Sequence, residues 1–160
     1  MSTGIPVNPE DLPIEAPYID DTSAVYHVEL NRIVGPKADK NGLMFFGINT
    51  TITEGDYEGF MIGKNYIKLP IPMPPDAKKR ERVQVDRHNS DFGRFARAFK
   101  PRGALAPLFN LTTLNDSDAV ARAREYLEQC IGNSAAVTVE NSEFPQGSGK
   151  MRSAINDFVV

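Results

Sequence analysis

The stretch VYHVELNRIVGPKADKNGLMFFGINTTI, residues 25–52, decides the fold class of this 160-residue chain. Over residues 25–33 apolar side chains alternate with polar ones, which is the period of a β-strand with one solvated face. Residues 36–42 combine a proline with an Asn-Gly pair, and Asn-Gly readily adopts the positive φ angles of tight hairpin turns. The alternation returns over residues 43–52. We therefore predict an antiparallel hairpin whose strands are residues 25–33 and 43–52.

Five further elements are predicted after this hairpin. In chain order they are a strand over residues 57–69, a helix over residues 92–100, a second helix that ends before Gly132, and strands over residues 135–139 and 151–160. The proline-rich segment 70–75 must end the third strand, because proline donates no ladder hydrogen bond. Apolar residues recur at helical spacing on both helices. Ser90 or Asp91 is predicted to cap the first helix, and Asn115 or Asp116 the second.

Three strands, two helices and two strands, in that order, match the element order of the OB fold. We therefore predict a mostly β (α+β) protein: a five-stranded OB-like antiparallel barrel with two helices inserted between strands three and four. A β-sandwich or an α+β meander would give a similar order and stays open as an alternative. Residues 1–22 are acidic and rich in proline, which predicts a flexible tail before a single domain over residues 23–160. The interspersed Ile5, Ile14, Tyr18 and Ile19 leave open the alternative that this segment lies along the domain surface.

The composition argues against most enzyme classes. One cysteine and two histidines, without paired spacing, offer almost no ligands for a transition metal, so we expect no cofactor. Cys130 falls on the apolar stripe of the second helix and is predicted to be an inert core residue. No G-x-S-x-G motif is present. Because no catalytic pattern is found, we expect that the protein is not an enzyme. Because there is no signal-peptide pattern and no long apolar run, we expect a cytoplasmic protein without a membrane partner.

Charge is distributed unevenly along the chain. The net charge is -3, yet residues 1–30 carry six acidic residues and no Lys or Arg, whereas residues 77–102 carry nine of the eighteen basic residues against three acids. Such local concentrations of one sign indicate a partner of the opposite sign. The nine candidate phosphate-binding residues are Lys78, Lys79, Arg80, Arg82, Arg87, Arg94, Arg97, Lys100 and Arg102. Spread over a predicted loop and helix, they suit a nucleic-acid backbone, with ordinary solvated surface as the alternative for each.

Aromatic side chains supply the second requirement of single-strand binding, because every base has a face on which such a ring can stack. The alternation that buries Phe46 turns Phe45 to the opposite face of its strand. Tyr57 and Tyr66 lie among polar neighbours in the predicted third strand. We therefore predict Phe45, Tyr57 and Tyr66 as base-stacking residues, and burial in the core is the alternative for each.

Four short motifs resemble a family of small phage-encoded proteins that accompany recombination genes and are similar to single-stranded-DNA-binding proteins. They are GDYEGFMIG (55–63), DFGRF (91–95), the Gly132 break before AVTV (136–139), and RSAINDF (152–158). The resemblance covers residues 24–158 and implies an OB-like barrel with a role in replication or recombination. Members of this kind often end in an acidic tail, whereas here the acidic block precedes the domain.

Together these features predict a single-stranded DNA-binding protein that acts as an accessory in replication or recombination. The expected partners are single-stranded nucleic acid, with DNA favoured over RNA, and replication or recombination enzymes; homo-oligomer formation stays open. The alternative is a structural or adaptor (virion) protein whose basic segment docks an acidic protein surface, and an enzyme comes third. A further hypothesis is that the acidic tail competes with nucleic acid for the basic segment.

Overall fold

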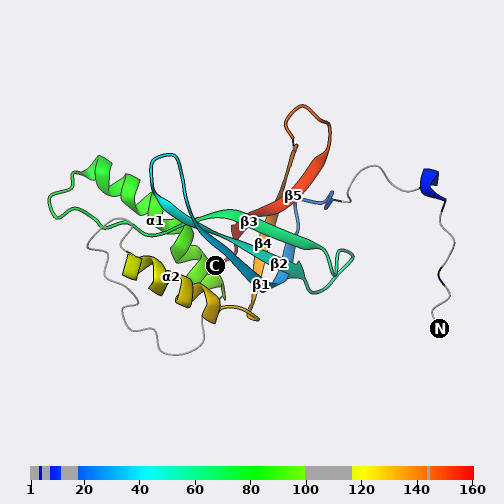
Figure 1. The fold of residues 1–160 in the computed structure, drawn as a ribbon, viewed down its shortest axis with the longest axis horizontal. Coiled ribbons are helices and arrows are strands. Elements are labelled where there is room, and N and C mark those ends of the chain that lie inside the picture. The colour runs from blue at the N-terminus through cyan, green and yellow to red at the C-terminus, as the bar shows by residue number, and fades with distance from the viewer. Residues whose placement is uncertain (1–3, 5–7, 12–17, 100–116, 144) are drawn as a thin grey trace.

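A computed structural model describes residues 4, 8–11, 18–99, 117–143 and 145–160 (Figure 1). In chain order its elements are η1 (Pro9–Asp11), β1 (Val25–Ala38), β2 (Met44–Ile52), β3 (Met61–Lys68), α1 (Lys79–Phe99), α2 (Ser117–Gln129), β4 (Ser134–Glu143) and β5 (Met151–Phe158). The five strands form one antiparallel sheet in the order β3-β2-β1-β4-β5. The predicted mostly β architecture with five antiparallel strands and two helices is confirmed.

The long strand β1 holds the sheet together, because it pairs with β2 over most of its length and with β4 near its start. This leaves β3 and β5 as the two edge strands. They nevertheless lie in contact with each other, and Lys64 Nζ of β3 donates a hydrogen bond to the backbone carbonyl of Asn156 in β5 at 3.3 Å. The contact between β3 and β5 is a seam, since no ladder pairing joins these two strands in the described part of the chain.

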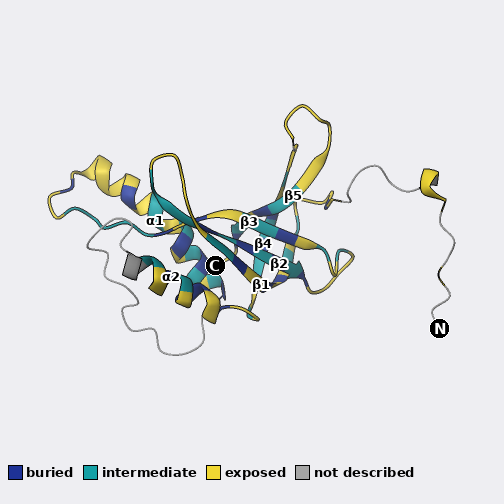
Figure 2. Cartoon of the chain, viewed as in Figure 1, coloured by how far each residue is buried: buried dark blue, intermediate teal, exposed yellow. Residues whose placement is uncertain are grey.

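The core lies between one face of the sheet and the two helices. Alternate residues of β2, including Phe46 and Ile48, are fully buried on this face. Two rings of α1, Phe95 and Phe99, pack edge-on against Phe158 of β5, with ring centroids 5.8 and 5.7 Å apart. Figure 2 shows the same division along α1, whose first half is largely exposed and whose second half is buried against the sheet.

The first helix is longer than predicted and begins at Lys79 instead of residue 92. The prediction followed apolar spacing, but the residues before Phe92 are mostly Lys, Arg, Glu and Gln, which have good intrinsic helix propensity without an apolar stripe. Neither Ser90 nor Asp91 caps this helix, because both lie inside it, and the Ser90 hydroxyl donates to the Arg87 carbonyl. The predicted caps of the second helix lie outside the described residues.

Several strand boundaries also differ from the prediction, and β4 continues to Glu143 instead of ending at residue 139. β1 continues to Ala38, so the turn to β2 is confined to residues 39–43, where the Asp39 carboxylate accepts hydrogen bonds from the N–H groups of Asn41 and Leu43. This local side-chain bonding fixes a tight turn after the proline. β3 begins at Met61, and residue 57 lies in the preceding turn, in which Gly59 has a φ of 91° that favours glycine.

The chain is already packed against the sheet at Ile19, before the predicted domain boundary at residue 22. Ile19 is fully buried in the core. Its backbone N–H donates to Ser153 Oγ at 2.8 Å, and its carbonyl accepts a bond from Asn141 Nδ2 at 2.6 Å. Ile19 and its two polar contacts to β4 and β5 thus hold this part of the segment on the domain, which is the alternative that its apolar residues left open.

Candidate nucleic-acid interface

The outer face of β1, β2 and β3 is the open surface of the sheet. Residues opposite each other on antiparallel strands share a face, so register decides which side chains lie on it. Because Phe46 and Ile48 face the core, their neighbours Phe45 and Asn49 face outward. The side chains of this outer face include Glu29, Arg32, Val34 and Lys37 of β1, Phe45, Asn49 and Thr51 of β2, and Met61, Tyr66 and Lys68 of β3.

An aromatic pair occupies one end of this outer face. The rings of Phe45 and Tyr66 lie with centroids 4.7 Å apart at an interplanar angle of 43°, and Tyr66 is 59% exposed. The register shift between Phe46 and Ile48 is a β-bulge in which two residues of β3 oppose the single residue Gly47. A bulge redirects side chains, and here it leaves both Asn65 and Tyr66 exposed. The predicted stacking residues Phe45 and Tyr66 are thus brought together by the fold.

Two lysines flank Phe45 across the sheet. The residue opposite Phe45 on β1 is Lys37, and the residue opposite it on β3 is Lys68. Both lysines are exposed, and neither forms an ion pair within the residues that the structure describes. We call this arrangement, Lys37, Phe45 and Lys68 together with the neighbouring Tyr66, the Lys-Phe-Lys row. It places an aromatic ring between two positive charges, a combination that proteins use to bind single-stranded nucleic acid.

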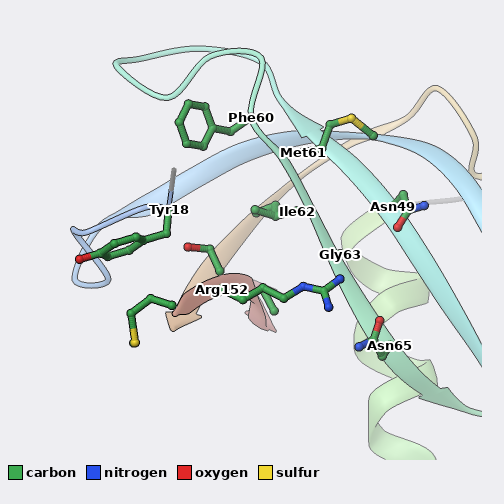
Figure 3. A pocket seen from close by; sticks show the side chains of 11 residues that line it. Tyr18, Asn49, Phe60, Met61, Ile62, Gly63, Asn65 and Arg152 are labelled. Atoms are coloured by element: carbon green, nitrogen blue, oxygen red, sulfur yellow. The ribbon is translucent and has the colours of Figure 1, made fainter. Parts of the chain in front are cut away.

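Two adjacent hollows, each of about 290 Å³, continue the outer face toward β5. The first lies over the seam between β3 and β5 (Figure 3), and the second lies beside Tyr66 and Lys37. Asn49, Asn65 and Arg152 line both of them. The outer face therefore combines stacking, positive charge and hydrogen-bonding side chains from four strands.

Four of the nine predicted basic residues lie on the exposed first half of α1, and a fifth lies directly before the helix. The four are Lys79, Arg80, Arg82 and Arg87, and the fifth is the exposed Lys78. His88 Nε2 is hydrogen-bonded at 3.0 Å to the carbonyl of Leu69, the residue directly after β3, so α1 contacts the chain where β3 ends. The first half of α1 therefore adjoins the end of the sheet that carries the Lys-Phe-Lys row.

The other predicted basic residues are divided. Arg94 Nε donates to Asp157 Oδ1 at 2.8 Å, and its Nη2 donates to the Phe158 carbonyl at 2.9 Å, so this guanidinium fastens α1 to the end of β5. Arg97 is exposed on the same helix. Lys100 and Arg102 lie outside the described residues.

Replacing Arg94 with alanine should lower the free energy of unfolding by about 1–2 kcal/mol, because a partly exposed ion pair and a charged hydrogen bond to a carbonyl are lost together. Arg97→Ala is the matched control, with an expected change within about 0.5 kcal/mol. Urea unfolding measures both. An R94A protein as stable as R97A, with weakened oligonucleotide binding instead, would assign Arg94 to nucleic acid as the sequence predicts.

Tyr57 is placed differently from the other two predicted stacking residues. Its ring packs edge-on between Tyr26 and Phe60, with centroid distances of 5.8 and 5.3 Å. Its hydroxyl donates a hydrogen bond to the Asp20 carboxylate. The Tyr57 ring is thus packed between two other rings of the protein. It supports the turn between β2 and β3 and is not part of the Lys-Phe-Lys row.

The side chains that carry nucleophilic or metal chemistry are not assembled into a site in the described ranges. Cys130 is fully buried, and this burial raises its pKa to about 12, so the thiol stays protonated at neutral pH. No cluster of three His, Cys, Asp or Glu residues that could hold a metal ion occurs among the described residues. Within the same residues no helix has the length and apolar character needed to cross a membrane.

Four basic residues of this face were not predicted from the sequence, because they lie outside the segment in which positive charge is concentrated. They are Arg32, Lys37, Lys68 and Arg152. These residues are distant in sequence and become neighbours only through strand register. Alternation in the predicted strands was a usable signal, since it turns Lys68 away from the buried Ile67. No protein-family model matches the chain, and no curated protein matches it.

Proposed function

We propose that this protein binds single-stranded nucleic acid, DNA above RNA, on the outer face of β1, β2 and β3, and that the sheet with its two edge strands in contact is an OB-like barrel. The Lys-Phe-Lys row carries the proposal. Unpaired bases expose π-faces that stack on Phe45 and Tyr66, and the flanking phosphates meet Lys37 and Lys68. The preference for DNA and a role in replication or recombination rest on the family resemblance described above.

The basic first half of α1 supports the same proposal, because it extends positive charge beyond the end of the sheet. It contacts the residue directly after β3 through the hydrogen bond between His88 and the Leu69 carbonyl. We expect a strand that crosses the Lys-Phe-Lys row to continue along the exposed Arg80 and Arg87 of this half of the helix. Such a continuous basic track is how sequence-neutral binders follow a flexible backbone.

Fluorescence anisotropy of labelled single- and double-stranded oligonucleotides across a salt series tests the proposal. We expect tighter binding of the single strand, with log affinity falling against log salt by about 0.7 per neutralised phosphate. The double variant Lys37→Ala, Lys68→Ala should reduce the magnitude of this slope by about 1.4, since two contacts are removed. Arg122→Ala on α2, exposed and remote from the outer face, should leave the slope unchanged. A flat salt response, or equal affinity for the duplex, would refute the proposal.

A second candidate function is supported by one observation on α1. Val83 is 45% exposed and lines a shallow surface with Lys79, Arg80 and Arg87. An apolar centre with a basic rim suits an acidic protein segment, as an adaptor protein would need. Stable capture of an acidic partner by a protein that binds no oligonucleotide would favour this function over the first.

A further inference from the structure

The second of the two hollows, which lies beside Tyr66, brings together the groups that a single nucleotide would contact. An exposed aromatic ring, a lysine and two amides line it, and they belong to Tyr66, Lys37, Asn49 and Asn65. The two amides also line the first hollow, so they lie where the hollows meet. Figure 3 shows them together at one side of the first hollow, away from its aromatic rings. The second hollow therefore offers stacking, charge and hydrogen bonding within one small space.

The two asparagines in this hollow differ from others in the protein. The amides of Asn49 and Asn65 make no hydrogen bond within the described part of the chain. Arg152 also lines both hollows, but it already has an interaction within the protein. Five other asparagines donate from Nδ2 to acceptors of the protein itself, namely Asn31, Asn89, Asn133, Asn141 and Asn156. The donors and acceptors of Asn49 and Asn65 are thus directed to solvent or to a ligand.

Gly47 keeps the second hollow open, and the backbone does not require glycine there. Its φ is not positive, and a Cβ would lie 3.5 Å from the carbonyl oxygens of Lys64 and Asn65, which is an ordinary contact distance. Because Phe46 and Ile48 face the core, a side chain at position 47 would point outward into the hollow that Gly47 lines. Glycine weakens a strand and often marks a place where a ligand comes close to the backbone.

We propose that this second hollow is a subsite that receives the Watson–Crick edge of one unpaired base, and that this contact adds to the preference for single strands. The inference rests on the proposed function and deepens it, because stacking alone reads only the face of a base. A base that stacks on Tyr66 meets the amides of Asn49 and Asn65 with its edge, and Lys37 of the same hollow meets its phosphate.

The chemistry of an amide suits this role. On its Watson–Crick edge each base has a donor beside an acceptor, and an amide has the complementary pair. An amide that rotates by half a turn exchanges its donor and acceptor, so the same asparagine fits all four bases. In a duplex the complementary strand occupies these edges, whereas an unpaired base presents them to the protein. The subsite is therefore neutral to sequence but selective for single strands.

Anisotropy with a dT oligonucleotide, and with the same oligonucleotide methylated at N3 of every thymine, tests the subsite. The methylated strand keeps its rings and phosphates, but a methyl group replaces the N–H donor of each Watson–Crick edge. We expect the parent protein to bind it about 5- to 100-fold more weakly than dT, the effect of two neutral hydrogen bonds.

The double variant Asn49→Ala, Asn65→Ala should bind dT more weakly by about the same factor and show no further loss with the methylated strand. Its salt slope and its affinity for the duplex should stay the same, because no charge is removed. Gly47→Val tests the space itself. It should weaken dT binding while the protein stays as stable as the parent in urea unfolding, because valine favours strands.

Asn31→Ala is the matched control, because the amide of Asn31 is bonded to Thr51 Oγ1 and lines neither hollow. It should keep the full difference between the two strands. Equal affinity of the parent for both strands, or a difference that N49A, N65A leaves intact, would overturn the subsite while the proposed function stands. A G47V protein that binds dT like the parent would overturn it as well. Failure of the parent to bind dT would overturn the proposed function and the subsite with it.

Discussion

Replacing Phe45 or Tyr66 with alanine should weaken binding of a dT oligonucleotide by about 1–3 kcal/mol for each ring, roughly 5- to 100-fold in dissociation constant. The two rings lie 4.7 Å apart at their centroids, so they act on neighbouring bases and on each other. The double variant should therefore lose less than the sum of the two single losses. Anisotropy at one fixed salt concentration gives all four affinities of this double-mutant cycle.

Tyr66→Phe is the control for this cycle, because it keeps the ring and removes only the hydroxyl. Its affinity should match the parent protein. Since Tyr66 is 59% exposed, Tyr66→Ala should leave the free energy of unfolding within about 0.5 kcal/mol of the parent value, which separates lost binding from lost folding. Unchanged affinity in the F45A, Y66A double variant would remove the Lys-Phe-Lys row from the binding surface.

The architecture could be predicted from local sequence because strands and helices repeat their apolar residues at different spacings. Alternation located β1 and β2 and turned Phe45 outward, and helical spacing located the buried half of α1 around Phe95. The first half of α1 could not be found in this way. Its residues are helical through intrinsic propensity, and the hydrogen bonds of His88 and Asn89 to the segment after β3 hold it in place.

The candidate site was predictable only in part, because its residues meet through register. Phe45 and Tyr66 were found one strand at a time, but Lys37 and Lys68 become partners of Phe45 only when three strands are aligned with their bulges. A one-residue shift would have moved either lysine to the other face. The high density of positive charge along the chain predicted instead that Arg94 binds phosphate. Its guanidinium is bound to Asp157 and the Phe158 carbonyl.

Ile19→Ala should lower the free energy of unfolding by about 2–5 kcal/mol, the usual cost of truncating a fully buried isoleucine. This is a large share of the roughly 5–15 kcal/mol that stabilises a small domain. The reason is structural, since Ile19 fills the core beneath β4 and β5, where Asn141 and Ser153 bind its backbone. Urea unfolding measures the change as a shift in the midpoint concentration. The slope of the free energy of unfolding against urea concentration should stay the same.

Val25→Ala is the control for this substitution, because it also shortens a branched apolar side chain near the start of the domain but at a position 51% exposed. Its expected effect is within about 0.5 kcal/mol. If I19A were as stable as V25A, the acidic, proline-rich segment would extend at least to residue 22, as its composition predicts. A large loss for I19A alone would show that the packed core already includes residue 19 of this segment.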